Sequence, residues 1–272
     1  MSIIKRCVLV TLLLLPAAAL AQAADVDCDQ APESCTTPLS RSLGAIKAYV
    51  TAPQRWDTPE WLLFGGAVVA IGASHGFDSR VRAHFTENSP ASLTGANVDA
   101  VQDALPAATL LVGTWTLAHI TDDGDGRREA GAMLEATVLS VGTSYVLNYA
   151  SGRRGPNQTA DPNRWWSGGT SFPSQHTTAA FAIGTVLAES GNSRYRLIRR
   201  FLGYGVGGFT AYERLKHNAH WLSDTVSGGA LGAASARFAM NRETGRPDPE
   251  AATVALSPIP HGLMLRYVWR LQ

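Results

Sequence analysis

The sequence predicts a mainly α protein, a helical bundle of about six core helices. Apolar stretches of helical length alternate with polar or proline-containing connections along residues 57–242, which we expect to form one domain. Small residues gather in the last part of that domain and favour close helix packing: Gly205, Gly207, Gly208, Gly228, Gly229, Gly232, Ala233 and Ala234. The chain has 272 residues, of which 45% are hydrophobic and 17% charged, so it is globular and long enough for a substantial core.

Residues 1–21 have the features of a secretory signal peptide. Lys5 and Arg6 precede an apolar run, Cys7–Leu20, which is short for a membrane span, and small residues around Ala21 offer a cleavage site. An uncleaved anchor is the alternative. We expect a protein exported across the inner membrane to the periplasm, where association with the membrane is compatible with the sequence.

Residues 22–56 are polar and interrupted by prolines, which predicts an irregular N-terminal arm. Cys28 and Cys35 are the cysteines that remain after removal of the signal, and an oxidising compartment favours a structural disulfide between them. With no further cysteine, a zinc–thiolate site is excluded.

Charge excludes one class of partner. Removal of the signal leaves 21 basic and 22 acidic residues, a net charge of −1. This balance gives no electrostatic case for nucleic acid and no polybasic patch for an anionic membrane. The sequence does not indicate an oligomeric state.

The first half of the domain contains two apolar helices. Residues 61–77 form an uncharged run that we interpret as a buried core helix, with a membrane-dipping segment as the alternative. Residues 78–97 are expected to form a connecting helix and loop, and residues 107–120 a second apolar helix.

Residues 122–126 resemble a fragment of a calcium loop, but they lack its later ligands and more simply cap the following helix, residues 128–149. Glu135 argues against a lipid-facing position for that helix. Residues 151–170 are expected to be a loop. Three further helices are predicted over residues 177–189, 201–212 and 220–240, followed by a tail or short strand within 243–272.

The residues with the clearest chemical pattern lie between Arg214 and Asp224. His220 and Asp224 are four apart, so on a helix Asp224 could accept a hydrogen bond from one ring nitrogen of His220 and leave the other nitrogen basic. Arg214 adds a fixed positive charge suited to an oxyanion. His217, His220 and Asp224 could instead bind a metal, but an Asp-oriented histidine needs fewer assumptions, so we expect no metal.

Two further patches could bind an anion. Ser174 and His176 precede an apolar helix, where backbone N–H groups and the helix dipole favour negative charge. Arg153 and Arg154 lie on a glycine-flanked turn and can present two guanidinium groups. Each feature also has a structural explanation, as a helix cap, a core histidine or a surface arginine pair. A serine-hydrolase triad is disfavoured because the chain lacks a Gly-x-Ser-x-Gly elbow.

In order and spacing, the three patches resemble the type 2 phosphatidic acid phosphatase and vanadium haloperoxidase superfamily. Its signature is Lys with Arg-Pro seven residues on, then Pro-Ser-Gly-His, then Arg with His six later and Asp four beyond. The third element matches fully, and the second matches with Gln175 in place of glycine; the matching positions are Pro173, Ser174, His176, Arg214, His220 and Asp224.

The first signature element departs at two positions. Asn148 occupies the place of the family's lysine, and Gly155 that of the arginine before Pro156. The adjacent Arg153 and Arg154 can supply positive charge. The two substitutions leave open a weakened or non-catalytic member that binds an anion.

The resemblance implies a metal-independent phosphatase that hydrolyses a phosphomonoester or a lipid (pyro)phosphate. His220 would be the nucleophile that forms a phosphohistidine, Asp224 would hold its tautomer, and His176 would act as acid and then base. The phosphate ligands would be Arg214, Arg153, Arg154, Ser174 and Gln175. No cofactor is implied, with vanadate as an inhibitor or, in a peroxidase, as a prosthetic group. The partner would be a phosphorylated small molecule or a lipid headgroup at the membrane surface.

Overall fold

The computed structural model describes most of the chain. The described residues are 38–88, 96–191, 193–244, 253–259 and 262–268. The signal peptide and the expected disulfide between Cys28 and Cys35 lie outside them. The chain divides into two compact units, with the boundary after Arg55.

In the first unit, the described residues form helix α2 (Pro38–Thr51) and the short 3₁₀ helix η2 (Ala52–Arg55). An irregular arm was expected here, and for these residues that expectation is wrong. Pro38 occupies the first position of α2, where a missing N–H costs no hydrogen bond. Pro therefore marks the start of a helix at this position.

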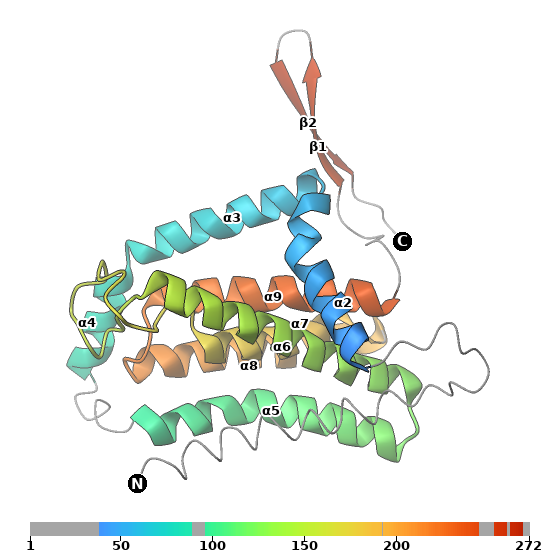
Figure 1. Cartoon of the computed structure of the whole chain (residues 1–272), viewed down its shortest axis with the longest axis horizontal. Helices are drawn as coiled ribbons and strands as arrows, with labels where there is room; N and C mark the ends of the chain where they lie inside the picture. The colour runs from blue at the N-terminus through green and yellow to red at the C-terminus, as the bar shows by residue number, and fades with distance from the viewer. Residues whose placement is uncertain (1–37, 89–95, 192, 245–252, 260–261, 269–272) are drawn as a thin grey trace. The chain divides into compact units, whose positions relative to one another are not determined.

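The second unit is mainly α, as predicted (Figure 1). Its helices are α3 (Thr58–His75), α4 (Asp78–Asn88), α5 (Ala96–Ile120), α6 (Gly124–Ser151), α7 (Gln175–Glu189), η4 (Ser193–Tyr195), α8 (Arg196–Lys216) and α9 (Leu222–Thr244). Each helix expected from the sequence is present, and α5, α6 and α8 extend beyond their predicted bounds.

An antiparallel hairpin follows α9. Strand β1 (Thr253–Ile259) pairs with β2 (Gly262–Val268), so that Thr253 lies opposite Val268. The sequence indicated a strand in the region of β2. It gave no signal for β1, in which Pro258 cannot donate to the ladder.

Helix α7 lies at the centre of the bundle, where it contacts α5, α6, α8 and α9. Figure 1 shows α6, α7, α8 and α9 running side by side. The core between them consists largely of small side chains. Its fully or almost fully buried members include Met133, Ala136, Ala180, Ala182, Ile183, Val186, Ala236 and Ala239.

Glycines bring the backbones of these helices together. A Cβ on Gly184 of α7 would lie 2.2 Å from the carbonyl oxygen of Gly203 on α8. A Cβ on Gly232 of α9 would lie 2.3 Å from the carbonyl oxygen of Thr178. Close helix packing was predicted, although Gly205 meets no described atom within 4 Å. The contacts at Gly184 and Gly203 therefore require glycine, because any side chain would separate the helices.

Helix α3 differs from the prediction of a buried core helix. Trp61, Leu63 and Val69 are 50%, 58% and 72% exposed, and Ser74 near its end is buried. The uncharged sequence predicts burial, but this helix packs on α9 from one side and leaves most of its apolar surface uncovered. Among the described residues, α6 is long and apolar enough to cross a membrane, and α3 with α4 passes the same test as a pair bent by 50°. Core helices of soluble proteins also pass it.

Helix α6 begins and ends with local capping interactions. Asp123 is its N-cap, and the side chain accepts a hydrogen bond from the N–H of Asp125 at 3.0 Å. This confirms the capping interpretation of residues 122–126. Gly152 ends the helix with φ of 54°, a left-handed conformation that favours glycine. The chain then enters the loop that leads to the candidate site.

Candidate functional site

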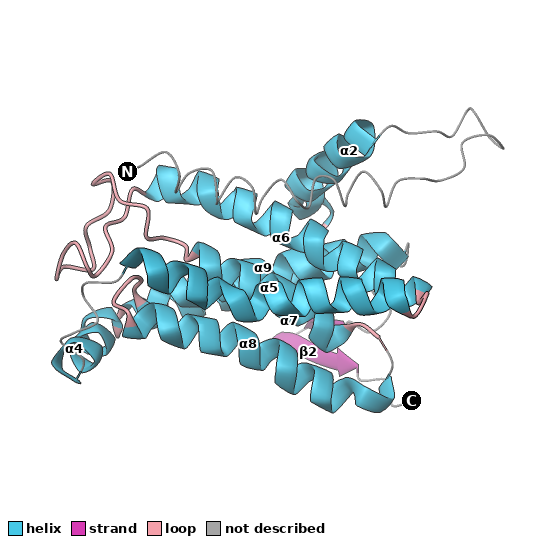
Figure 2. Ribbon diagram, turned by 90° about the horizontal axis from the view of Figure 1, so that it is seen from below, coloured by secondary structure: helices cyan, strands magenta, loops and turns pink. Residues whose placement is uncertain are grey.

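The predicted site residues lie in two connections, or in the helix ends next to them, at the same end of the bundle. The loop 152–174 joins α6 to α7, and the turn 217–221 joins α8 to α9 (Figure 2). The backbone N–H of Ser174 donates to the carbonyl oxygen of Asp224 at 3.0 Å. The indole N–H of Trp221 donates to the carbonyl oxygen of Arg154 at 2.8 Å. All three sequence patches therefore meet.

His220 lies in the turn before α9, and its ring is held by Ser171, whose hydroxyl oxygen is 3.5 Å from Nδ1. Nδ1–H donates to the carbonyl oxygen of Ser171 at 2.8 Å. Because a carbonyl can only accept, this bond places the proton on Nδ1 and leaves Nε2 with a free lone pair. The backbone N–H of Ala219 donates to the carbonyl oxygen of Arg214 at 3.0 Å, and this bond helps to close the turn between α8 and α9.

Asp224 is fully buried and makes bonds other than the one expected. Oδ2 accepts from the Trp221 N–H at 2.9 Å and from the Ser171 hydroxyl at 2.5 Å. Oδ1 accepts from Arg153 at 2.5 Å. Nδ1 of His220 is 3.8 Å from Oδ2, too far for a hydrogen bond. The helical four-residue spacing does not apply, because α9 begins only at Leu222.

The two arginines of the first patch occupy different environments. Arg153 is fully buried between the carboxylates of Asp78 and Asp224, at 2.7 and 2.5 Å. Arg154 is exposed, and its Nε donates to the carbonyl oxygen of Ser167 at 3.1 Å. The prediction that Arg153 binds phosphate does not fit this arrangement, because its side chain points into the protein.

Arg214 is buried, with 7% of its surface exposed, and is paired with a residue that the sequence did not indicate. Nη1 donates to Oδ2 of Asp103 on α5 at 2.7 Å. Its buried Nε has no hydrogen-bond partner among the described residues. In the sequence, the only feature that could have pointed to Asp103 is its position as an acidic residue close to the predicted apolar helix, residues 107–120. Arg214 thus has fixed orientation and a donor still unused.

Asp103 also belongs to a group of residues that lie close enough together to bind a metal ion. Its carboxylate, that of Glu213 and the ring of His217 offer atoms within 4.8 Å of one another. This differs from the metal alternative considered from the sequence, which combined His217 with His220 and Asp224. Because Oδ2 of Asp103 accepts from Arg214 and lies 3.4 Å from His217, the group is explained as an ion-pair cluster.

The start of α7 contains the second patch. Ser174 is the N-cap residue, but its hydroxyl pairs with Thr177 Oγ1 at 3.0 Å instead of capping the helix. Gln175 is the first helical residue and does not have a positive φ, so the turn does not require the family's glycine. His176 is half-buried in the first turn. That its ring faces His220 stays a prediction.

Two of the three residues that depart from the family signature, Asn148 and Gln175, bond to each other. The Asn148 amide donates to the carbonyl oxygen of Pro173 at 2.9 Å. The Gln175 amide donates to Oδ1 of Asn148 at 3.2 Å. A neutral amide pair therefore links the end of α6 to the start of α7. The sequence gave no sign of it, since the residues are far apart in the chain.

Comparison with known proteins shows that part of the chain is similar to a known family. Residues 129–247 match the PAP2 superfamily. These residues make up less than half of the chain, and we refer to them as the PAP2 region because of this similarity. The PAP2 region extends from α6 to α9 and contains all eight predicted catalytic and phosphate-binding residues.

A curated relative agrees with this assignment. Over 106 residues the chain is 37% identical to a lipid A 1-phosphatase of Porphyromonas gingivalis, a match that covers 38% of this chain and 22% of that protein. The matched stretch is thus less than a quarter of the relative's length. No solved structure matches the chain.

Residues outside the PAP2 region complete the site. Asp78 on α4 pairs with Arg153, and Asp103 on α5 pairs with Arg214. Each buried arginine of the PAP2 region is therefore neutralised by a carboxylate that precedes the region in the chain.

Proposed function

We propose that the protein is a metal-independent phosphatase that acts on a phosphorylated lipid through a phosphohistidine intermediate. The observation that carries the proposal is the hydrogen bond from Nδ1 of His220 to Ser171, which leaves Nε2 as a nucleophile. The similarity of residues 129–247 to the PAP2 superfamily supports the same chemistry.

In the first step, Nε2 of His220 attacks phosphorus, and the bond from phosphorus to the leaving oxygen breaks. His176 protonates that oxygen. In the second step His176 takes a proton from water, whose oxygen attacks phosphorus and displaces Nε2, so that phosphate leaves and both histidines return to their starting states. Asp224 stabilises the positively charged ring at 3.8 Å through the field of its carboxylate.

Positive charge for the phosphate would come from Arg214, whose Nε is unused, and from the exposed Arg154. Backbone N–H groups at the start of α7, at Gln175 and His176, add donors. Phosphoryl transfer requires mainly positioning and charge, so two guanidinium groups are consistent with catalysis without a metal ion.

Two observations support a lipid substrate. The relative is named for dephosphorylation of lipid A. The apolar face of α3 is exposed at Trp61, Leu63 and Val69, and the same helix ends at His75, beside Arg153 at 3.0 Å. We propose that α3 contacts the membrane and that the site lies at its end. The predicted signal peptide places this contact on the periplasmic side.

The test is phosphate release from a phosphorylated lipid in detergent micelles and from p-nitrophenyl phosphate, with EDTA and no added metal. His220→Ala is expected to lower kcat by about 10⁴-fold or more, because the nucleophile is lost. The matched control His119→Ala removes an exposed histidine on α5 and should retain activity. Equal phosphate release by wild type and His220→Ala contradicts the proposal.

A non-catalytic role in anion binding is the second candidate. The neutral pair of Asn148 and Gln175 replaces a cation of the family signature, which favours weaker catalysis. Binding of vanadate without any phosphate release would support it. Halide oxidation by peroxide after addition of vanadate would instead indicate a peroxidase.

A further inference from the structure

Arg153 uses all of its donors inside the protein. Nε donates to the carbonyl oxygen of Pro162 at 3.1 Å. Nη1 donates to the Ser223 hydroxyl at 2.8 Å and to Asp224 at 2.5 Å. Nη2 donates to Asp78 at 2.7 Å and to the same Pro162 oxygen at 2.8 Å. A guanidinium has five N–H groups, and these contacts account for all five, so none is left for a phosphate oxygen.

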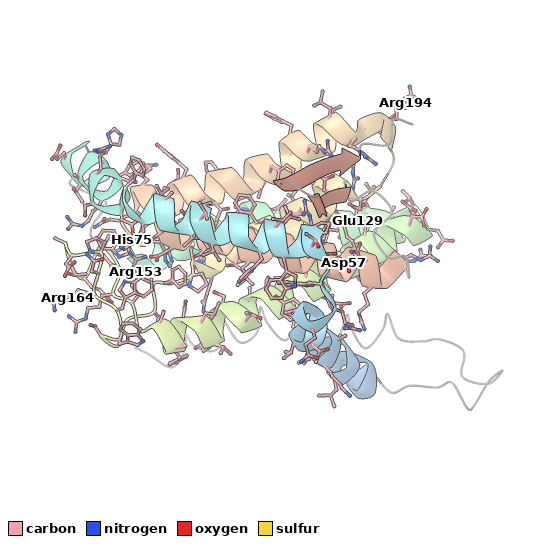
Figure 3. All side chains as sticks on the ribbon, turned by 90° about the horizontal axis from the view of Figure 1, so that it is seen from above. Asp57, His75, Glu129, Arg153, Arg164 and Arg194 are labelled. Atoms are coloured by element: carbon pink, nitrogen blue, oxygen red, sulfur yellow. The ribbon has the colours of Figure 1, made fainter. Side chains whose placement is uncertain are left out.

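Asp78 secures the opposite side of this guanidinium. It is fully buried at the start of α4. Oδ1 accepts the Ser223 N–H at 2.9 Å, and Oδ2 accepts the Ser223 hydroxyl at 2.7 Å. His75 Nδ1 is 2.9 Å from the same Oδ2. Figure 3 shows Arg153 beside His75 at one end of the molecule. Asp78 thereby fixes both Arg153 and the first turn of α9, where Asp224 lies.

The arrangement extends from Asp224 to the nucleophile. Ser171 donates its hydroxyl to Asp224 at 2.5 Å and its N–H to the carbonyl oxygen of Arg153 at 3.0 Å. The carbonyl oxygen of Ser171 accepts Nδ1–H of His220 at 2.8 Å. Arg153 therefore determines the position of Ser171 through its side chain and its backbone, and Ser171 sets the ring of His220.

Burial makes this arrangement rigid. Asp78, Arg153 and Asp224 are all fully buried, and charges removed from water require fixed partners. The ring of Trp165 lies over the guanidinium, with its centroid 4.4 Å from Cζ, and the ring of Trp221 lies at 5.6 Å. The Arg153 side chain is therefore fully removed from water.

We propose that Arg153 and Asp78 are positioning residues that fix Asp224, Ser171 and the ring of His220, and that Arg153 does not bind phosphate. The inference rests on the proposed function and reassigns a residue expected to bind the anion. Asp78 lies outside the PAP2 region, so the positioning of His220 depends on α4 as well.

The test compares Arg153→Lys and Asp78→Asn with Arg164→Lys, a matched control on the same loop whose side chain is 62% exposed. Lys cannot bond Asp78, Asp224 and Pro162 together, so we expect kcat for p-nitrophenyl phosphate to fall about 10- to 100-fold, as for a slightly misplaced reacting group. KM and the inhibition constant for vanadate should stay within about twofold. Arg164→Lys should match wild type.

Two kinetic outcomes overturn the inference. If Arg153→Lys weakens vanadate inhibition by the same factor as it lowers kcat, Arg153 is a phosphate ligand. If kcat is unchanged in both variants, neither residue positions His220. Asp78→Asn leaves the buried Arg153 paired with Asp224, so this variant is expected to fold. A melting temperature within a few degrees of wild type would show that a loss of kcat is not a loss of structure.

A second measurement separates this inference from the proposed function. The Nδ1–H proton of His220, assigned by its absence in His220→Ala, should give a slowly exchanging NMR signal in wild type. It should be lost in Arg153→Lys and retained in Arg164→Lys. If wild type releases no phosphate, the proposed function fails, and this signal alone decides the positioning: loss in Arg153→Lys supports it and retention contradicts it.

Discussion

At the scale of single residues, most of the charged side chains of the site are buried and paired with side chains of opposite charge. Arg153 lies between Asp78 and Asp224, and Arg214 pairs with Asp103 at 2.7 Å. Removing one member of a buried pair costs about 3–5 kcal/mol, because the remaining charge is left in a low dielectric. Such pairs therefore fix the side chains, and substitution of one member destabilises the protein.

The departures from the family signature have local reasons. Gly155 replaces an arginine, and a Cβ at this position would lie 3.1 Å from the carbonyl oxygen of Ala219, in the turn that precedes His220. A side chain at residue 155 would thus disturb the turn that holds His220.

The amide pair gives a prediction at this scale. Asn148→Ala and Gln175→Ala should be non-additive in stability, with a coupling of about 0.5–1.5 kcal/mol, because each removes the same hydrogen bond. Urea unfolding of the two single variants and the double variant measures it. The matched pair Asn148→Ala with Gln158→Ala should show additive effects. A coupling near zero for Asn148 and Gln175 would mean that the bond does not contribute to stability.

At the scale of elements, α7 is held between α8 and α9 by backbone contact. Gly184 and Gly203 meet at the crossing of α7 and α8, and Gly232 brings α9 against Thr178. This packing fixes the starts of α7 and α9 side by side, and with them the bond from Ser174 to Asp224. The position of the site thus depends on contacts along the whole length of α7.

Gly184→Ala should destabilise the protein by about 1–3 kcal/mol, because the new methyl group would lie 2.2 Å from the Gly203 oxygen. Gly205→Ala on α8 is the matched control: its side chain meets open space, so helix propensity should stabilise the fold by about 0.5–1 kcal/mol. Thermal unfolding of both variants checks the sign. A stable Gly184→Ala would show that the helices can separate at no cost.

At the scale of the whole molecule, the described surface contains large apolar side chains on several helices. Val69 on α3, Leu197 and Phe201 on α8 and Ile120 on α5 are each more than 70% exposed. These residues lie on different helices, and on α3 they include three exposed apolar side chains, Trp61, Leu63 and Val69. An exposed apolar helix face is suited to contact with a membrane or a partner. Helix α3 reaches the site, because it ends at His75, whose Nδ1 is 3.0 Å from Nη2 of Arg153.

We predict that the protein binds phospholipid vesicles through α3. Replacing Trp61, Leu63 and Val69 with Ser should abolish flotation with phosphatidylethanolamine–phosphatidylglycerol vesicles, because the apolar contact area is lost. Activity on p-nitrophenyl phosphate should be retained, since none of these side chains is a proposed site residue. The matched control replaces Val112, Leu117 and Ile120 on α5, exposed to a similar extent, and should still float. Equal loss of flotation in the α3 and α5 variants would contradict a specific role for α3.

The sequence by itself determined the approximate bounds of the helices in the second unit, because apolar periodicity, caps and prolines act locally. It also determined the order of the site motifs, and thereby the family. His220 and Asp224 were predicted as site residues from their spacing.

The tertiary structure decided which groups meet. It paired Asp224 with Arg153 instead of His220, supplied Asp78 and Asp103 from outside the PAP2 region, and left α3 exposed where its composition predicted burial. Spacing along a chain defines neighbours within one helix, whereas the partner of a buried charge is whichever group the packing of other helices brings within about 3 Å.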